Sequence, residues 1–181
     1  MPIEERVRLM KKAAQVLEDN NEEYAKTLTL EMGKPITESR GEVKKCDWVC
    51  NYYADNAQGF LADEIIKTDA QLSMVQHEPI GGVLAIMPCN FPFWEVFRFA
   101  ASTLMAGNVG VLKHAPNVFD CAKQMEEVFI KAGFPEGVFQ NFIVHHDRTE
   151  SIIAHDIVQA ITLTGSGAAG SSLAALYGKY I

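Results

Sequence analysis

Three features of this sequence have residue types and positions suited to chemistry: Asn90, Lys113 and the small-residue turn Gly165–Gly170. An amide can donate hydrogen bonds to a developing oxyanion, and small residues before a helix let a phosphate approach the backbone. Each feature also has a simpler interpretation. Asn90 can cap a helix, Lys113 can be a solvated strand end, and the turn can be a tight strand-to-helix connection without ligand.

A βαβ unit is predicted around Asn90 and Lys113. Residues 83–87 form a short apolar run typical of a strand buried on both faces, and Pro88 ends it. Residues 91–106 are long enough for a helix, with Pro92 suited to its first turn, and residues 109–112 form a second apolar strand. Strands joined in this way are parallel, and ligands bind beyond their carboxyl ends. Asn90 and Lys113 should therefore lie at one edge of the sheet.

The pattern continues to the end of the chain. A helix is expected over about 118–132, a strand over 139–144, a short helix over 149–154 and a strand over 157–164. The Gly165–Gly170 turn, which has the Gly-x-Gly-x-x-Gly pattern, then opens another helix. This alternation predicts an α/β fold in which residues 81–181 form a Rossmann-like, doubly wound parallel sheet with flanking helices.

Residues 1–59 are predicted to form three amino-terminal helices, the second of which stops at Gly33-Lys34-Pro35. The third carries an aromatic and cysteine stripe that we assign to core packing rather than to a ligand site; it comprises Val43, Cys46, Cys50, Tyr53 and Ala57. Residues 60–80 differ in character. Residues 71–78 resemble a strand but alternate only weakly, so this segment is expected to lie outside the main core.

Composition excludes several classes of protein. The 181 residues are 48% hydrophobic and 22% charged, with a net charge of −7 and interspersed signs, which disfavours nucleic acid and anionic membranes as partners. No signal-peptide pattern is present. Four scattered cysteines then indicate free thiols in a reducing cytoplasm. Cys46 and Cys50 are four residues apart, but no further ligand is near in the sequence, so no metal site is predicted.

Arg98 is the side chain most informative about a substrate. It is expected on the same helical face as Phe91 and Trp94, in a helix that is otherwise nearly all apolar. A buried guanidinium without a partner is costly. Arg98 should therefore either pair with an acid of the protein or receive an anionic substrate.

Four stretches together resemble the aldehyde dehydrogenase superfamily: PCNFPFW, LKHAP, KAGFPEGVFQNF and LTGSGAAG. They occur in that family's order and spacing from about residue 4 to residue 170. EMGKP and LKHAPN bring the chain nearest to the bacterial succinate-semialdehyde dehydrogenases. The resemblance implies oxidation of an aldehyde to its acid with NAD or NADP, with succinate semialdehyde as the expected substrate. It also implies that residues 60–80 form an extended arm that reaches another subunit of a homo-oligomer.

The resemblance assigns roles residue by residue. Asn90 would donate to the oxyanion, and Phe91 and Arg98 would contact substrate, with Arg98 on its carboxylate. Lys113 would bond the adenosine ribose, and Gly165-Ser166 would be the functional pair of the glycine-rich turn. The positions expected at the cofactor are Ile86, Met87, Pro88, Cys89, Lys113, Pro116, Gly165 and Ser166.

Two positions depart from the family pattern. Cys89 stands where the family usually has tryptophan, which removes an apolar wall from the cofactor site. Pro116 stands where NAD-preferring members often place a glutamate that accepts from both ribose hydroxyls. Without that carboxylate a 2′-phosphate is neither repelled nor crowded, so both NAD and NADP remain candidates.

The family's nucleophilic cysteine and its glutamate base both follow the Gly-Ser turn, and neither occurs before Ile181. Cys89 neighbours Asn90, but nothing near it in the sequence would activate its thiol as a substitute. We therefore expect an amino-terminal fragment of such an enzyme that is inactive by itself. The other interpretation is a non-catalytic nucleotide-binding or assembly module.

Overall fold

A four-stranded parallel sheet lies at the centre of the computed structural model, which describes residues 1–180 apart from the side chain of His146. The strands run in the order β5-β4-β3-β6. Their bounds are β3 Gly82–Ile86, β4 Val109–Lys113, β5 Phe139–Asn141 and β6 Val158–Leu163. Strands β3, β4 and β5 follow one another toward one edge of the sheet, and β6 pairs with the other side of β3. The predicted α/β class and Rossmann-like sheet are confirmed.

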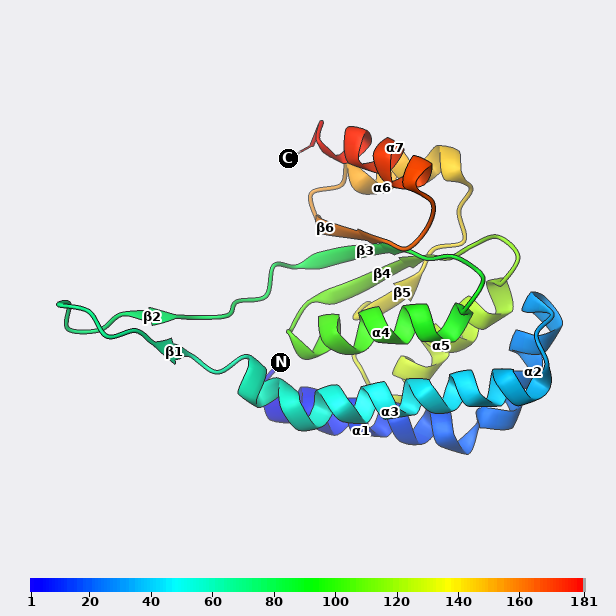
Figure 1. Cartoon of the computed structure of the whole chain (residues 1–181), viewed down its shortest axis with the longest axis horizontal. Coiled ribbons are helices and arrows are strands. Elements are labelled where there is room, and N and C mark those ends of the chain that lie inside the picture. Colours follow the sequence, from blue (N-terminus) through cyan, green and yellow to red (C-terminus); the bar gives the residue numbers. More distant parts are fainter. Residues whose placement is uncertain (181) are drawn as a thin grey trace.

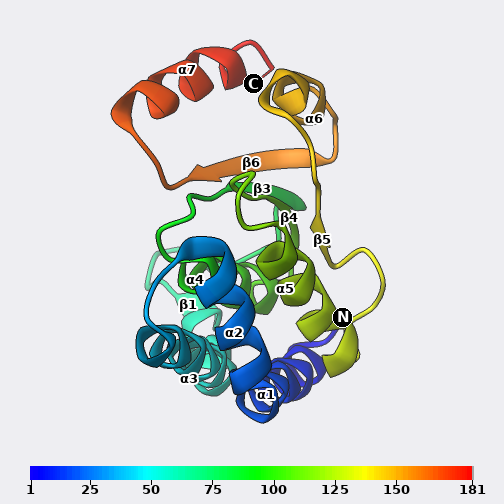
Figure 2. The same cartoon turned by 90° about the vertical axis from the view of Figure 1, so that its right-hand side faces the viewer.

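Helices cover both faces of this sheet (Figures 1 and 2). Helices α4 (Pro92–Met105) and α5 (Phe119–Ala132) pack on one face, and α1 (Ile3–Asp19), α2 (Asn21–Met32) and α3 (Ile36–Phe60) form a further layer beyond them. The other face carries η1 (His146–Arg148), α6 (Thr149–Ile153) and α7 (Gly167–Tyr177). The chain thus changes faces at the point where the strand order reverses, as in a doubly wound fold.

Glycine and proline set the ends of the helices as the sequence predicts. Gly33 ends α2 in the left-handed conformation at φ 84°, and Pro35 is the residue that precedes α3. Gly133 ends α5 in the same way at φ 94°. Gly82 has a different role, because a Cβ there would lie 2.3 Å from the carbonyl oxygen of Ile157. A side chain at Gly82 would therefore push the start of β3 away from Ile157, the residue directly before β6.

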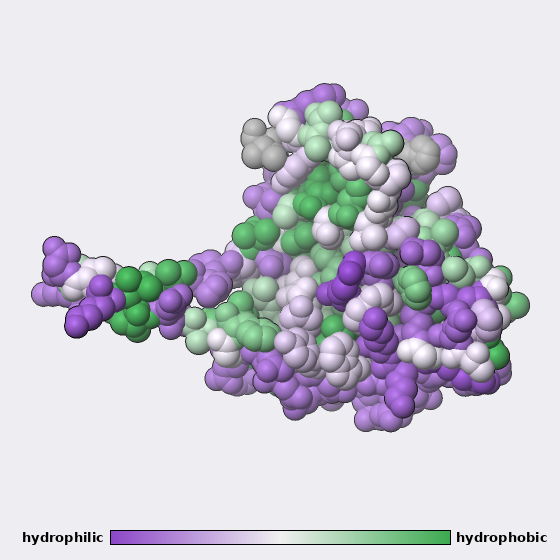
Figure 3. Space-filling model, viewed as in Figure 1, coloured by the Kyte–Doolittle hydropathy of each residue, from purple (hydrophilic) through white to green (hydrophobic). Residues whose placement is uncertain are grey.

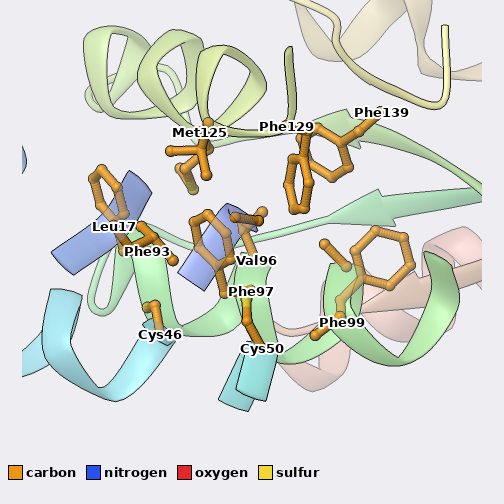
Figure 4. Close-up of a cluster of buried hydrophobic side chains, with 14 of the residues drawn as sticks. Leu17, Cys46, Cys50, Phe93, Val96, Phe97, Phe99, Met125, Phe129 and Phe139 are labelled. Carbon is orange, nitrogen blue, oxygen red and sulfur yellow. The ribbon is translucent and has the colours of Figure 1, made fainter. Parts of the chain in front are cut away.

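The main core lies between the sheet and the α1–α3 layer, and aromatic rings run through it (Figure 4). Phe97 stacks on Phe129 with ring centroids 5.4 Å apart, and Phe129 contacts Phe139 of β5 at 4.7 Å. Cys46 and Cys50 face into the same cluster and are fully buried, which confirms their assignment to packing. Burial raises the pKa of both thiols, so they stay protonated and unreactive.

The second face of the sheet has a thinner cover. Leu84, Val111, Ile153 and Val158 form a small buried cluster beneath α6 and α7. Helix α7 contributes half-buried Leu173 and Leu176 but has no fully buried residue. Within residues 1–180, no helix is both long and apolar enough to cross a membrane.

Residues 61–81 leave the body of the molecule as a long ribbon (Figure 1). Within it, β1 (Glu64–Ile65) and β2 (Met74–Val75) pair antiparallel over only two residues each. The strand expected over 71–78 is therefore much shorter than predicted, because an isolated pair of strands has no sheet to stabilise it. The ribbon exposes apolar side chains, visible as a green patch in Figure 3; they are Ile65, Ile66, Leu72, Met74 and Val75.

Candidate functional site

The carboxyl edge of the sheet brings three distant segments together. The N–H of Met87, just past β3, donates to the carbonyl oxygen of Lys113 at 3.2 Å. The N–H of Thr164, just past β6, donates to the carbonyl oxygen of Ile86 at 3.1 Å. Strand order reverses between β3 and β6, and open α/β sheets bind ligands at such a switch point. The loop that carries Asn90 and the turn that carries Gly165-Ser166 both leave the sheet here.

Asn90 lies in the loop between β3 and α4, with its side chain exposed. The residue that precedes α4 is Phe91, and no side chain at that position caps the helix. Among the hydrogen bonds of residues 1–180, none involves the Asn90 carboxamide. The interpretation of Asn90 as the helix cap is therefore wrong for this structure, and its amide is free to bind a ligand.

The cap of α4 comes from α3. An oxygen of Glu42 (Oε1) accepts from the N–H of Phe93 at 2.8 Å and from the N–H of Trp94 at 3.0 Å. The other oxygen accepts from the ammonium of Lys34, and both charged side chains are buried. Sequence reasoning missed this pair. The available signal was that Glu42 falls on the buried stripe of α3, where a charge must have a partner.

His114 ties the same turn to β4 and was also missed. Its ring is buried, and its Nδ1 accepts from the N–H of Ala115 at 2.8 Å. Its Nε2 therefore carries the proton and donates to the carbonyl oxygen of Pro92 at 3.2 Å. Burial lowers the His114 pKa, which keeps the ring neutral. The start of α4 is thus held by α3 on one side and by the end of β4 on the other.

Arg98 is half exposed rather than buried, and it forms an ion pair with Glu95 on the preceding turn. Glu95 is nearly buried and also accepts a hydrogen bond from the Thr164 hydroxyl at 3.4 Å. Of the two alternatives expected for Arg98, the structure shows pairing with an acid of the protein. About half of the Arg98 side chain is still exposed to solvent, so an anion can reach it.

Phe91 and Trp94 border a hollow of about 490 Å³ between α3 and α4. The Lys34 ammonium lies 4.2 Å from the centroid of the Phe91 ring, and the Lys45 ammonium lies 3.7 Å from the Trp94 ring. These distances fit cation–π contacts. Phe91 precedes the first turn of α4, while Trp94 and Arg98 lie within the helix. Arg98 does not line this hollow.

Lys113 borders a second hollow, of about 340 Å³, between the strand ends and α7. Its apolar lining includes Ile86, Leu163 and Leu173. Ser166 precedes α7, and its hydroxyl oxygen accepts from the N–H of Ala169 at 3.2 Å. A Cβ at Gly165 would make only an ordinary contact with Leu163 at 3.6 Å, so the fold itself does not require glycine there.

These features fit a nucleotide cofactor. The hollow supplies a cation and apolar walls. The turn Gly165-Ser166 is not among its lining residues, but it is open and precedes the amino end of α7, which favours phosphate. Of the other positions expected at the cofactor, Met87 points its side chain into the core, and Pro116 is exposed in the loop before α5. Pro88 and Cys89 are half-buried in the loop after β3.

None of the four cysteines has the surroundings of an activated nucleophile among the described residues. Burial raises the pKa of the thiols of Cys46, Cys50 and Cys121, the last of which also lies beside the Glu31 carboxylate. Cys89 is half-buried and has no hydrogen-bonded base among residues 1–180. Nor do these residues contain a cluster of side chains that could hold a metal ion.

Comparison with known proteins gives a consistent result. A model of the aldehyde dehydrogenase family matches residues 1–181. A probable succinate-semialdehyde dehydrogenase (NADP+) of Synechocystis sp. is 51% identical over 174 residues, which cover 96% of this chain and 38% of the relative. A succinate-semialdehyde dehydrogenase (NADP+) of Mycobacterium tuberculosis is 43% identical over 180 residues, covering 98% and 39%.

Solved structures agree. A succinic semialdehyde dehydrogenase of Streptococcus pyogenes in complex with NADP+ superposes with a TM-score of 0.95 at 35% identity, covering 98% of this chain and 39% of that one. An NAD-dependent aldehyde dehydrogenase of Sinorhizobium meliloti gives 0.94 at 31% identity, covering 100% and 36%. The chain thus spans less than two-fifths of the length of each of these four proteins.

Proposed function

The chain belongs to the aldehyde dehydrogenase family, and we propose that it supplies the cofactor-binding and oxyanion-binding part of an enzyme that oxidises succinate semialdehyde to succinate. One observation carries the proposal. The segments bearing Asn90, Lys113 and Gly165-Ser166 meet at the switch point of the sheet, and the Asn90 carboxamide is uncommitted. Because the relatives are much longer, we assign the complete reaction to the complete enzyme, in which these residues form one part.

Asn90 is assigned to the reacting carbonyl. Attack of a thiolate on an aldehyde places negative charge on the carbonyl oxygen, and an amide positioned at that oxygen stabilises it. The exposed carboxamide beyond β3 can donate such a hydrogen bond without breaking a bond of the resting structure. The thiolate and its base must come from residues other than the buried cysteines described above.

Lys113, Gly165 and Ser166 are assigned to the cofactor. Bound NAD or NADP would accept the hydride that leaves the aldehyde carbon. The Lys113 ammonium can donate to a ribose hydroxyl, and the turn before α7 can receive a phosphate against open backbone. Pro116 offers no carboxylate to repel a 2′-phosphate, and the Synechocystis and Mycobacterium relatives are named for NADP+. We therefore favour NADP.

The ribbon of residues 60–80 is assigned to assembly of a homo-oligomer. It projects from the body and exposes the apolar patch formed by Ile65, Ile66, Leu72, Met74 and Val75, which a second subunit would remove from water. All four cysteines are free thiols, which suits the reducing cytoplasm that we propose as the location.

Reduction of NADP tests the assignment. The complete enzyme should form NADPH from succinate semialdehyde, and Asn90→Ala should lower kcat by about 10²- to 10³-fold, the usual cost of one oxyanion donor. The 181 residues alone should bind cofactor but show no turnover, as expected of a nucleotide-binding module. An unchanged kcat in Asn90→Ala, or turnover by the 181 residues alone, would contradict the assignment.

A further inference from the structure

The ion pair between Lys34 and Glu42 is the most buried charged contact in the described chain. Lys34 is 8% exposed and Glu42 is 6% exposed. Moving two charges out of water is unfavourable unless the geometry satisfies both of them, and apolar replacements often stabilise a fold equally well. A role in stability alone is therefore a weak explanation for this pair.

Glu42 lies where it determines how α4 begins. Its carboxylate accepts three hydrogen bonds: two from the N–H groups of Phe93 and Trp94 in the first turn of α4, and one from the Lys34 ammonium. Without Glu42 those buried N–H groups would need another acceptor. The nearest residue with the chemistry of a helix cap is Asn90, which precedes the first turn of α4.

Lys34 acts on the same turn from a second direction. Its ammonium donates to Glu42 and also lies 4.2 Å from the centre of the Phe91 ring. Phe91 directly follows Asn90 in the chain. Lys34 neutralises the carboxylate that caps α4 and places a cation over the neighbouring aromatic ring. The pair thus contacts the turn through both its backbone and its side chain.

We propose that Glu42, held in place by Lys34, is a positioning residue that keeps the Asn90 carboxamide out of the helix cap and available to the reacting oxygen. This inference rests on the proposed function, because it assumes that Asn90 serves the oxyanion. It predicts that loss of Glu42 lets Asn90 turn back to cap α4. The reaction then loses its hydrogen-bond donor although Asn90 is still present.

The chain offers a matched control in Glu31 of α2. The Glu31 carboxylate caps α5 in the same manner, accepting from the N–H groups of Asp120 at 2.9 Å and Cys121 at 2.8 Å. Glu31→Ala removes an equivalent cap without touching the Asn90 turn. An effect common to Glu31→Ala and Glu42→Ala reports stability, and an effect confined to Glu42→Ala reports positioning.

NMR of the 15N-labelled 181-residue chain is the first test. Glu42→Ala should speed amide exchange of Phe93 or Trp94 by about 10-fold or more, the scale of a lost hydrogen bond to a charged group. It should also shift the Asn90 side-chain amide signals, because the Asn90 side-chain oxygen would then accept from the first turn of α4. Glu31→Ala should affect Asp120 and Cys121 instead and leave the Asn90 signals in place.

A rescue variant keeps the test informative if Glu42→Ala does not fold. In Lys34→Met/Glu42→Gln the glutamine oxygen still caps α4, and methionine replaces the cation that would face the glutamine amide. This double variant should restore the Asn90 signals, whereas Glu42→Gln alone should not. Asn90 signals that are the same in Glu42→Gln and in the wild type would overturn the proposal.

Turnover in the complete enzyme separates this inference from the proposed function. Glu42→Ala should lower kcat on succinate semialdehyde while leaving KM for NADP unchanged, and Glu31→Ala should alter neither. If Asn90→Ala abolishes turnover but Glu42→Ala does not, the positioning role is wrong and the function of Asn90 stands. If Asn90→Ala has no effect, the proposed function itself fails.

Discussion

Replacing Arg98 by leucine provides the sharpest test of the proposed substrate. Arg98 lies two turns into α4, and helical side chains lean toward the amino end of their helix, here toward the loop that carries Asn90. A guanidinium in that position can hold a carboxylate while the aldehyde at the other end of a short substrate lies near Asn90. Arg98→Leu keeps an apolar side chain on the helix and removes only the charged, forked donor.

The structure sets the size of the expected effect. A hydrogen bond to a charged group contributes about 1.5–3 kcal/mol. The Arg98 side chain is 51% exposed and already pairs with Glu95, so water and a competing carboxylate both weaken its contact with a substrate. We therefore expect the lower end of that range. About 1.5 kcal/mol corresponds to roughly a 10-fold loss in kcat/KM for succinate semialdehyde.

The assay compares two aldehydes in the complete enzyme. Arg98→Leu should lower kcat/KM for succinate semialdehyde and spare butanal, which has no carboxylate. Glu95→Gln is the complementary variant: it removes the charge that competes for Arg98, so kcat/KM for the semialdehyde should rise while butanal is unaffected. Equal losses on both aldehydes in Arg98→Leu would show that Arg98 is structural, and the assignment of a carboxylate-bearing substrate would fail with it.

Two further predictions concern the cofactor and pH. Lys113→Ala and Gly165→Val should each weaken NADP binding measured by calorimetry. Lys113→Ala removes the cation of the hollow, and Gly165→Val fills the turn before α7. Unchanged affinity in both variants would mean that the cofactor site is elsewhere. Burial lowers the His114 pKa, so below the ordinary value of about 6.5 the unfolded chain binds a proton that the folded chain does not. The stability that neutral His114 contributes is therefore complete above about pH 6.5 and falls as the pH drops. Urea unfolding at several pH values gives the free energy of unfolding as a function of pH, and this free energy should depend less on pH in His114→Gln than in the wild type. The same pH dependence in both proteins would refute this.

Much of this protein follows from local signals in its sequence. Apolar runs locate the helices and strands, and Gly33, Pro88 and Gly133 mark where some of them end. Such signals are readable because backbone preference and periodic burial act over a few residues. The alternation of strands and helices makes the sheet parallel, and a parallel sheet puts Asn90 and Lys113 at one edge. These inferences need no knowledge of distant contacts, and from β3 to α7 the structure has the predicted order of strands and α-helices.

Only the tertiary structure decides which groups remain free at that edge. Asn90 has the chemistry of a helix cap, yet the cap is Glu42, 51 residues before the Phe93 whose N–H it accepts. Local preference cannot foresee such a partner, because a buried N–H donates to whichever acceptor the packing brings to it. The ion pair of Arg98 with Glu95 is by contrast a local contact three residues apart on α4, and what packing adds is that Glu95 is nearly buried and accepts from Thr164 just past β6. The sequence thus places the candidate site residues at one edge of the sheet, and the packing of α3 against α4 leaves the Asn90 carboxamide uncommitted.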